Sequence, residues 1–223
     1  MYRISTLVLL VGGILSCSEA LPEFHASTDQ VRLSEWNLFT VNDGSIEANR
    51  HTLVFTPSNS LFSDYAQKLR TLWVPPGETI AVEDGRLKYP VGTVLSKSFF
   101  YPVAGDGRVE LVANPATVPQ LPKNDHRVLE TRLLVRRTDG WEGLPYVWND
   151  ELTEAFLRIA GTSISISSTS QDSPRFTYFV PNQNQCAGCH TRVHPDGGLE
   201  PLGAVAHQLN ASGPGGEMGQ VTY

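Results

Sequence analysis

Two cysteines and a histidine near the end of the chain are the clearest candidates for chemistry. Cys186 and Cys189 are separated by two residues, and His190 follows the second cysteine directly. This CxxCH spacing allows two thiols to reach both vinyl groups of one porphyrin while the histidine ligates the iron. The pattern predicts one covalent c-type haem, with thioether links at Cys186 and Cys189 and His190 as the proximal metal ligand.

Three other chemistries stay open for the same cysteines. Paired thiols in an oxidising compartment commonly form a disulfide. The pair could also bind zinc together with His194 or His207, although structural zinc usually has four well-spaced ligands. A redox-active dithiol is the third alternative, but the sequence lacks the βαβ pattern of thioredoxin-like proteins.

The sixth ligand of such an iron has three candidates. Met218 is the only methionine besides Met1, and its glycine-rich segment could fold over a haem face, so we predict it as the second metal ligand. His194 and His207 are the alternatives, and any of the three could instead be an exposed tail residue. Methionine would raise the reduction potential, whereas a second histidine would lower it.

The remaining cysteine, Cys17, lies at the end of a predicted export signal. The apolar run over 7–15 is too short to span a bilayer and has the length of a signal-peptide core. Residues 14–17 resemble a bacterial lipobox, in which cleavage precedes a cysteine that receives lipid. We therefore predict a lipoprotein signal peptide over 1–16 and a membrane anchor at Cys17, on the periplasmic side of the outer membrane in a Gram-negative host. A plain secretory signal is the alternative.

Composition narrows the class of partner. The formal net charge is −6 and no basic cluster stands out, so nucleic acid is not expected as a partner. The 19 glycines and 15 prolines favour turns and short strands over long helices.

A haem on a largely exposed tail suits the exchange of electrons with a docking redox partner protein.

The elements that must position the motif follow a β-rich rhythm. Short apolar runs alternate with Gly, Pro and Asp turns, which predicts a mainly β fold with an antiparallel β-sandwich or barrel-like body. Strands are expected near 52–55, 69–74, 79–82, 91–101, 108–113 and 128–137, with an edge strand or loop over 162–173. Short helices are predicted over 60–68 and 149–158, the second with Asn149 as its cap.

Four segments result from this pattern. The signal peptide over 1–16 precedes a polar tether over 17–33, and the β-rich domain covers 34–180. The irregular haem-binding segment over 181–223 has little apolar content of its own, so we expect it to pack against the β domain.

Several longer motifs carry a resemblance to a known family. They are 61–66 (LFSDYA), 89–97 (YPVGTVLSK), 130–135 (ETRLLV), 140–149 (GWEGLPYVWN), 180–190 (VPNQNQCAGCH), and 201–203 (PLG) with 208–210 (QLN). In this order they resemble a bacterial family of exported diheme c-type cytochromes. The resemblance implies haem attachment at Cys186, Cys189 and His190. Members of that family continue to a second CxxCH, whereas this sequence contains one, as expected for a single-haem version or a truncated relative.

Charged and aromatic members of these motifs have two interpretations. Trp141, Tyr146 and Trp148 could line a ligand pocket, but such aromatics more often pack in cores. Glu130 and Arg132 share one face of a strand, and for them, as for Lys97 and Asp64, a structural ion pair is favoured over catalysis.

Three functions compete at this point. The first is an electron-transfer lipoprotein with one haem c, and it is favoured over an enzyme. The second is a haem-dependent enzyme, or a subunit of one, acting on a small molecule. The third is a β-sandwich binding module in which the CxxC pair is only a disulfide.

Overall fold

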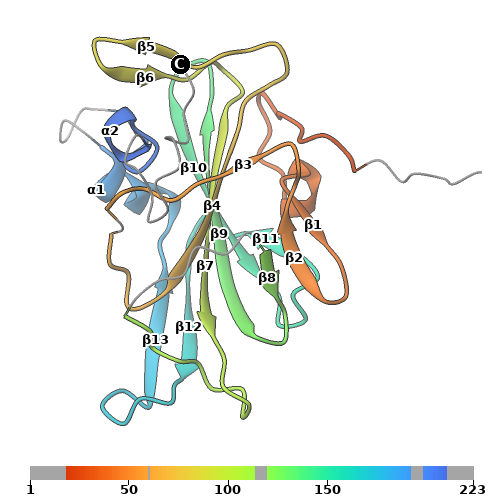
Figure 1. The fold of residues 1–223 in the computed structure, drawn as a ribbon, viewed down its shortest axis with the longest axis vertical. Coiled ribbons are helices and arrows are strands. Elements are labelled where there is room, and N and C mark those ends of the chain that lie inside the picture. Colours follow the sequence, from red (N-terminus) through yellow and green to blue (C-terminus); the bar gives the residue numbers. More distant parts are fainter. Residues whose placement is uncertain (1–18, 60, 114–119, 192–197, 210–223) are drawn as a thin grey trace, which may run out of the picture.

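An open antiparallel sheet of six strands forms the centre of the molecule. The computed structural model describes residues 19–59, 61–113, 120–191 and 198–209. The sheet order is β11-β10-β9-β7-β4-β3 (Figure 1). Its strands are β3 (Leu53–Val54), β4 (Gln67–Trp73), β7 (Val94–Pro102), β9 (His126–Arg136), β10 (Trp141–Trp148) and β11 (Ala155–Leu157). The mainly β prediction is confirmed, and the described strands form no closed barrel.

A smaller sheet covers one face of the central sheet. Its three strands are β1 (Phe39–Val41), β2 (Ser45–Ala48) and β8 (Gln120–Pro122), and the 3₁₀ turn η1 (Leu33–Trp36) lies beside them. Trp36, Ile46 and Leu121 are fully buried in one cluster with Leu133 and Leu144 of the central sheet. Alternate residues of β9 and β10 point to this side, as the period of two in a strand requires. We call it the packed face.

The opposite face has two separate covers. One is the hairpin of β12 (Thr162–Ser167) and β13 (Arg175–Val180); the other is the C-terminal segment with η2 (Gln183–Gln185), α1 (Cys186–His190) and α2 (Ala206–Leu209) (Figure 1). The hairpin packs on Phe99 and Tyr101, whereas the segment packs on Leu72, Leu95 and Leu134. We call this side the C-terminal face. A further hairpin joins β5 (Ala81–Glu83) to β6 (Arg86–Lys88).

Both predicted helices are wrong. Residues 61–66 have no helix, because Asp64 and Tyr65 adopt positive φ angles of 47° and 62°, and β4 begins at Gln67. The segment over 149–158 forms a turn followed by β11. Asn149 does cap, since its Oδ1 accepts from the amides of Thr153 and Glu154, but the cap closes a turn. In the described ranges, the α-helices lie at 186–190 and 206–209.

Several predicted strands agree more closely with the structure. Residues 162–167 form a strand, and the long stretch over 91–101 supplies β7. Residues 108–113 make only isolated bridges at Val109. The described part of the expected tether packs on the body, because Asp29 pairs with Arg137 and Leu157 donates its amide to the Val31 carbonyl.

The described part of the tail packs on the β domain, as expected. Ala204 and Leu209 are buried beside Leu134, and Tyr89 donates its hydroxyl to the Ala204 carbonyl at 2.7 Å. Within the described ranges, no helix has the length and apolar character needed to span a bilayer.

Candidate functional site

The CxxCH residues form a single helical turn, α1, that follows η2 without a break. Asn182 starts this unit, since its Oδ1 accepts from the Gln185 amide at 2.8 Å while the Gln185 side chain accepts from the Asn182 amide at 2.9 Å. This reciprocal pairing satisfies two amides that would otherwise lack partners. The predicted motif is therefore brought together on one element. Both cysteines are free thiols in the structure, Cys186 partly buried and Cys189 exposed.

Gly143 of β10 allows α1 to pack closely against the central sheet. A Cβ atom at Gly143 would lie 2.9 Å from Cys186 Sγ and 3.2 Å from Cys186 Cβ, which is closer than side chains normally approach. Glycine is therefore required here by proximity. Cys186 Sγ also points toward the Asn182 carbonyl at 3.8 Å. The first cysteine is thereby fixed against the sheet, whereas the second remains open to solvent.

His190 ends α1 and is held by the segment that follows. Its Nδ1 lies 2.8 Å from the Glu200 carbonyl oxygen, and the Glu200 amide donates back to the His190 carbonyl at 2.8 Å. A carbonyl only accepts, so Nδ1 carries the proton in this contact. In a neutral imidazole the lone pair then resides on Nε2. The geometry leaves Nε2 as the nitrogen that can bind a metal.

Electrostatics favours the neutral forms of both residues. Burial lowers the pKa of His190, and the positive charges of Lys97 and Arg132 lower it further, against the Glu200 hydrogen bond. Burial also raises the pKa of the Cys186 thiol, partly offset by Arg132. A thiol with a raised pKa is a poor redox nucleophile, so the environment of Cys186 is unlike that of a reactive dithiol.

The other predicted ligands divide into two groups. His207 is described and lies exposed on α2. Met218, His194 and the lipidation candidate Cys17 lie outside the described residues. Within the described ranges, no cluster of three or more His, Cys, Asp or Glu side chains could hold a metal ion.

A groove of about 610 Å³ runs beside the motif helix. Trp141 and Gly143 of β10 line one side, and Gln183 and Leu199 belong to the C-terminal segment. Trp141 contacts Tyr89 edge to face at 5.5 Å, so it is partly packed and partly available to a ligand. The other predicted aromatics, Tyr146 and Trp148, are buried on the packed face, which confirms their core interpretation.

Three of the charged motif residues, Lys97, Glu130 and Arg132, lie on the C-terminal face. Glu130 and Arg132 form the expected ion pair, with Arg132 Nη2 2.5 Å and Nε 2.8 Å from the two carboxylate oxygens. Asp64 lies on the exposed segment before β4. Lys97 makes no ion pair among the described residues, and Arg70, which sequence reasoning did not single out, lies directly opposite it. Only the strand register reveals this neighbour.

Comparison with known proteins adds no relative. No protein-family description, no curated protein and no solved structure matches the chain.

Proposed function

We propose that the chain is a c-type cytochrome-like protein that binds one covalent haem through Cys186, Cys189 and His190. The observation that carries this proposal is the contact between His190 Nδ1 and the Glu200 carbonyl, which leaves Nε2 as the metal-binding nitrogen. Metal-ligating histidines commonly donate their other ring N–H to a carbonyl or carboxylate in this way. This contact supports His190 as the iron ligand of the proposed haem.

Each part of the motif has a separate task in this proposal. The Cys186 and Cys189 thiols would hold the haem by adding their S–H bonds across its two vinyl groups, which would form thioethers without loss of any atom. When bound, the haem supplies a one-electron iron couple. Gly143 seats Cys186 against β10, and Glu200 holds the imidazole in one tautomer. Burial lowers the pKa of His190 and so favours the neutral imidazole, the form that ligates a metal.

Electron transfer is the activity that we propose for this haem. Cys189 is exposed and His190 is only partly buried, so the motif lies at the molecular surface. A surface haem suits single-electron exchange with a docking protein. Export and a lipid anchor at Cys17 complete the proposal, because bacteria attach haem c outside the cytoplasm.

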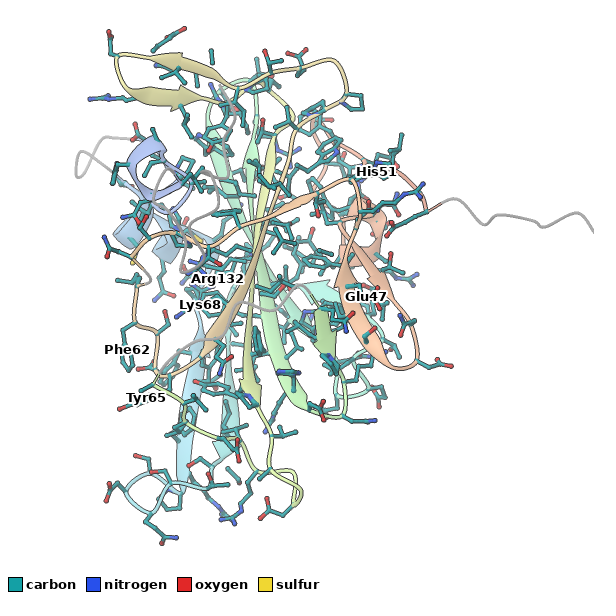
Figure 2. All side chains as sticks on the ribbon, viewed as in Figure 1. Glu47, His51, Phe62, Tyr65, Lys68 and Arg132 are labelled. Atoms are coloured by element: carbon teal, nitrogen blue, oxygen red, sulfur yellow. The ribbon has the colours of Figure 1, made fainter. Side chains whose placement is uncertain are left out.

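A matched pair of histidine variants tests the assignment. His51 is exposed, and Figure 2 shows it at the upper right of the molecule, away from Lys68 and Arg132. The full chain is exported in a host with a cytochrome c maturation system, and haem per protein is measured by absorbance and intact mass. We expect His190→Ala to lose most of its haem and His51→Ala to keep it.

Two outcomes would overturn the proposal. A colourless wild-type protein whose mass shows a Cys186–Cys189 disulfide would favour the binding-module alternative. Equal haem content in the two variants would remove His190 from the site.

A further inference from the structure

Three cations stand in one row across the C-terminal face. Arg70 of β4 is directly opposite Lys97 of β7, and Lys97 is directly opposite Arg132 of β9. Directly opposed residues of antiparallel strands share a face, with Cβ atoms about 4.5–5.5 Å apart. Like charges in such positions repel, so this row destabilises the isolated sheet. We call these three residues the cation row.

Lys68 and the aromatic ring of Phe99 lie beside the cation row. Phe99 lies under the charges, with the Arg132 guanidinium 4.3 Å, Lys97 Nζ 5.1 Å and Lys68 Nζ 5.9 Å from its centroid. Figure 2 shows Lys68 and Arg132 close together on the side of the sheet that carries α1. The ring offsets part of the repulsion, but a neutral ring cannot cancel the positive charge of these side chains.

Nearby carboxylates neutralise only part of the cation row: Glu130 balances Arg132 and leaves Arg70 and Lys97 without an ion pair among the described residues. Glu130 is fully buried, and both of its oxygens accept from Arg132, while the Tyr178 hydroxyl donates to Oε1 at 2.6 Å. Lys68 donates to the Leu61 carbonyl and has Asp64 as its acidic neighbour. In the ranges that the structure describes, neither the Arg70 guanidinium nor the Lys97 ammonium group donates a hydrogen bond, although the backbones of both residues belong to the hydrogen-bonded sheet. Burial and the neighbouring cations lower the pKa of Lys97 to about 8.

The cation row lies one step along the sheet from the motif. Leu134 of β9 is directly opposite Gly143, on which Cys186 stands, and Arg132 is two residues before Leu134. Two residues of a strand span about 7 Å.

We propose that Arg70, Lys97 and Arg132 form a carboxylate-binding site, and that the two propionates of the haem occupy it in the mature protein. This inference rests on the proposed function. Carboxylate oxygens supply the acceptors that Arg70 and Lys97 lack, and their charge balances the cation row. A guanidinium and an ammonium facing a carboxylate pair are suited to fix the orientation of a porphyrin linked through Cys186.

Succinate, which carries two carboxylates, probes the site in the full chain. Thermal unfolding is followed against succinate concentration for protein prepared with and without haem. Wild type, Lys97→Met and Lys88→Met are compared, the last being a matched loss of an exposed lysine on β6. In the haem-free form we expect succinate to raise the unfolding temperature of wild type and Lys88→Met. Binding to Lys97→Met should be weaker by about tenfold or more.

The haem-loaded form separates the two sources of carboxylate. If the propionates occupy the cation row, succinate leaves the unfolding temperature of the loaded protein unchanged. An equal succinate effect in both forms would show a site for a free carboxylate and overturn the propionate assignment. No succinate effect in haem-free wild type would overturn the site itself. Failure to load haem would instead contradict the proposed function, while the haem-free titration would still decide whether carboxylates bind.

Discussion

The two faces of the central sheet treat polar groups in opposite ways. On the packed face, buried hydroxyls pair with each other: Ser98 with Thr131 at 2.7 Å, and Thr71 with Ser96 at 2.6 Å. Trp148 Nε1 also donates to Thr131. On the C-terminal face, the charged side-chain groups of Arg70 and Lys97 have no hydrogen-bond partner in the described ranges. The first pattern stabilises a fold, whereas the second leaves capacity for a ligand.

The largest loss of stability is expected at the buried ion pair of Glu130 and Arg132 on the C-terminal face. Glu130→Gln removes the charge that balances Arg132 and is expected to cost about 3–5 kcal/mol, because it breaks a buried ion pair. Tyr178→Phe removes only the hydroxyl donor and should cost about 1.5–3 kcal/mol, as for a hydrogen bond to a charged group. Urea unfolding measures both values. Equal costs for the two variants would contradict the ranking.

The hydroxyl network of the packed face gives the next effect. Thr131→Val preserves the side-chain shape but leaves the Trp148 indole N–H and the Ser98 hydroxyl without a partner. The expected loss of stability is about 1–3 kcal/mol for each unpaired group. Thr131→Ser keeps the acceptor and serves as the control. The same urea titration compares them, and an unchanged stability for Thr131→Val would show that the network contributes nothing.

A smaller effect on stability is expected at the contact between the motif and the sheet. Gly143→Ala forces a methyl group against Cys186 and should cost about 1–3 kcal/mol, as overpacking usually does. It should also reduce haem loading, because α1 must move. Gly188 lies inside the motif, but an added Cβ there meets nothing within 4 Å, so Gly188→Ala is the control. Greater damage from Gly188→Ala would refute this geometry.

The smallest effect is a pH dependence of the cation row. Lys97 has a folded pKa of about 8, below its ordinary value, as a result of burial and of repulsion by Arg132 and Arg70. Lysines of this kind destabilise the fold below their folded pKa, and the destabilisation is relieved as pH rises toward the unfolded value of about 10.4. In haem-free protein, Lys97→Met should therefore be more stable than wild type at pH 7.

The stability advantage of Lys97→Met should shrink toward pH 9.5. Thermal unfolding across this range tests the sign, and the shift is expected to be on the order of a few °C. Lys88→Met controls for the loss of a surface lysine. A stability difference that grows with pH would contradict the assigned direction.

The sequence made some features readable and hid others. Turn residues between short apolar runs predicted the mainly β body, and the CxxCH spacing singled out the candidate site. The helical turn α1 that carries both cysteines was not predicted, because the polar residues before Cys186 are typical of an irregular segment. Asn149 misled, because its side chain caps a turn as readily as a helix, and pairing of β11 with β10 decided the outcome. The cation row was hidden, because Arg70, Lys97 and Arg132 come from three separate strands and meet only through their register.

The central claim is most directly tested by the optical spectrum of the full chain matured in a periplasm. The account predicts the absorption of a haem that stays with the protein after denaturation, because Cys186 and Cys189 hold it covalently, and loss of that absorption in His190→Ala. A colourless wild-type protein, or a haem removed by denaturation alone, would contradict it.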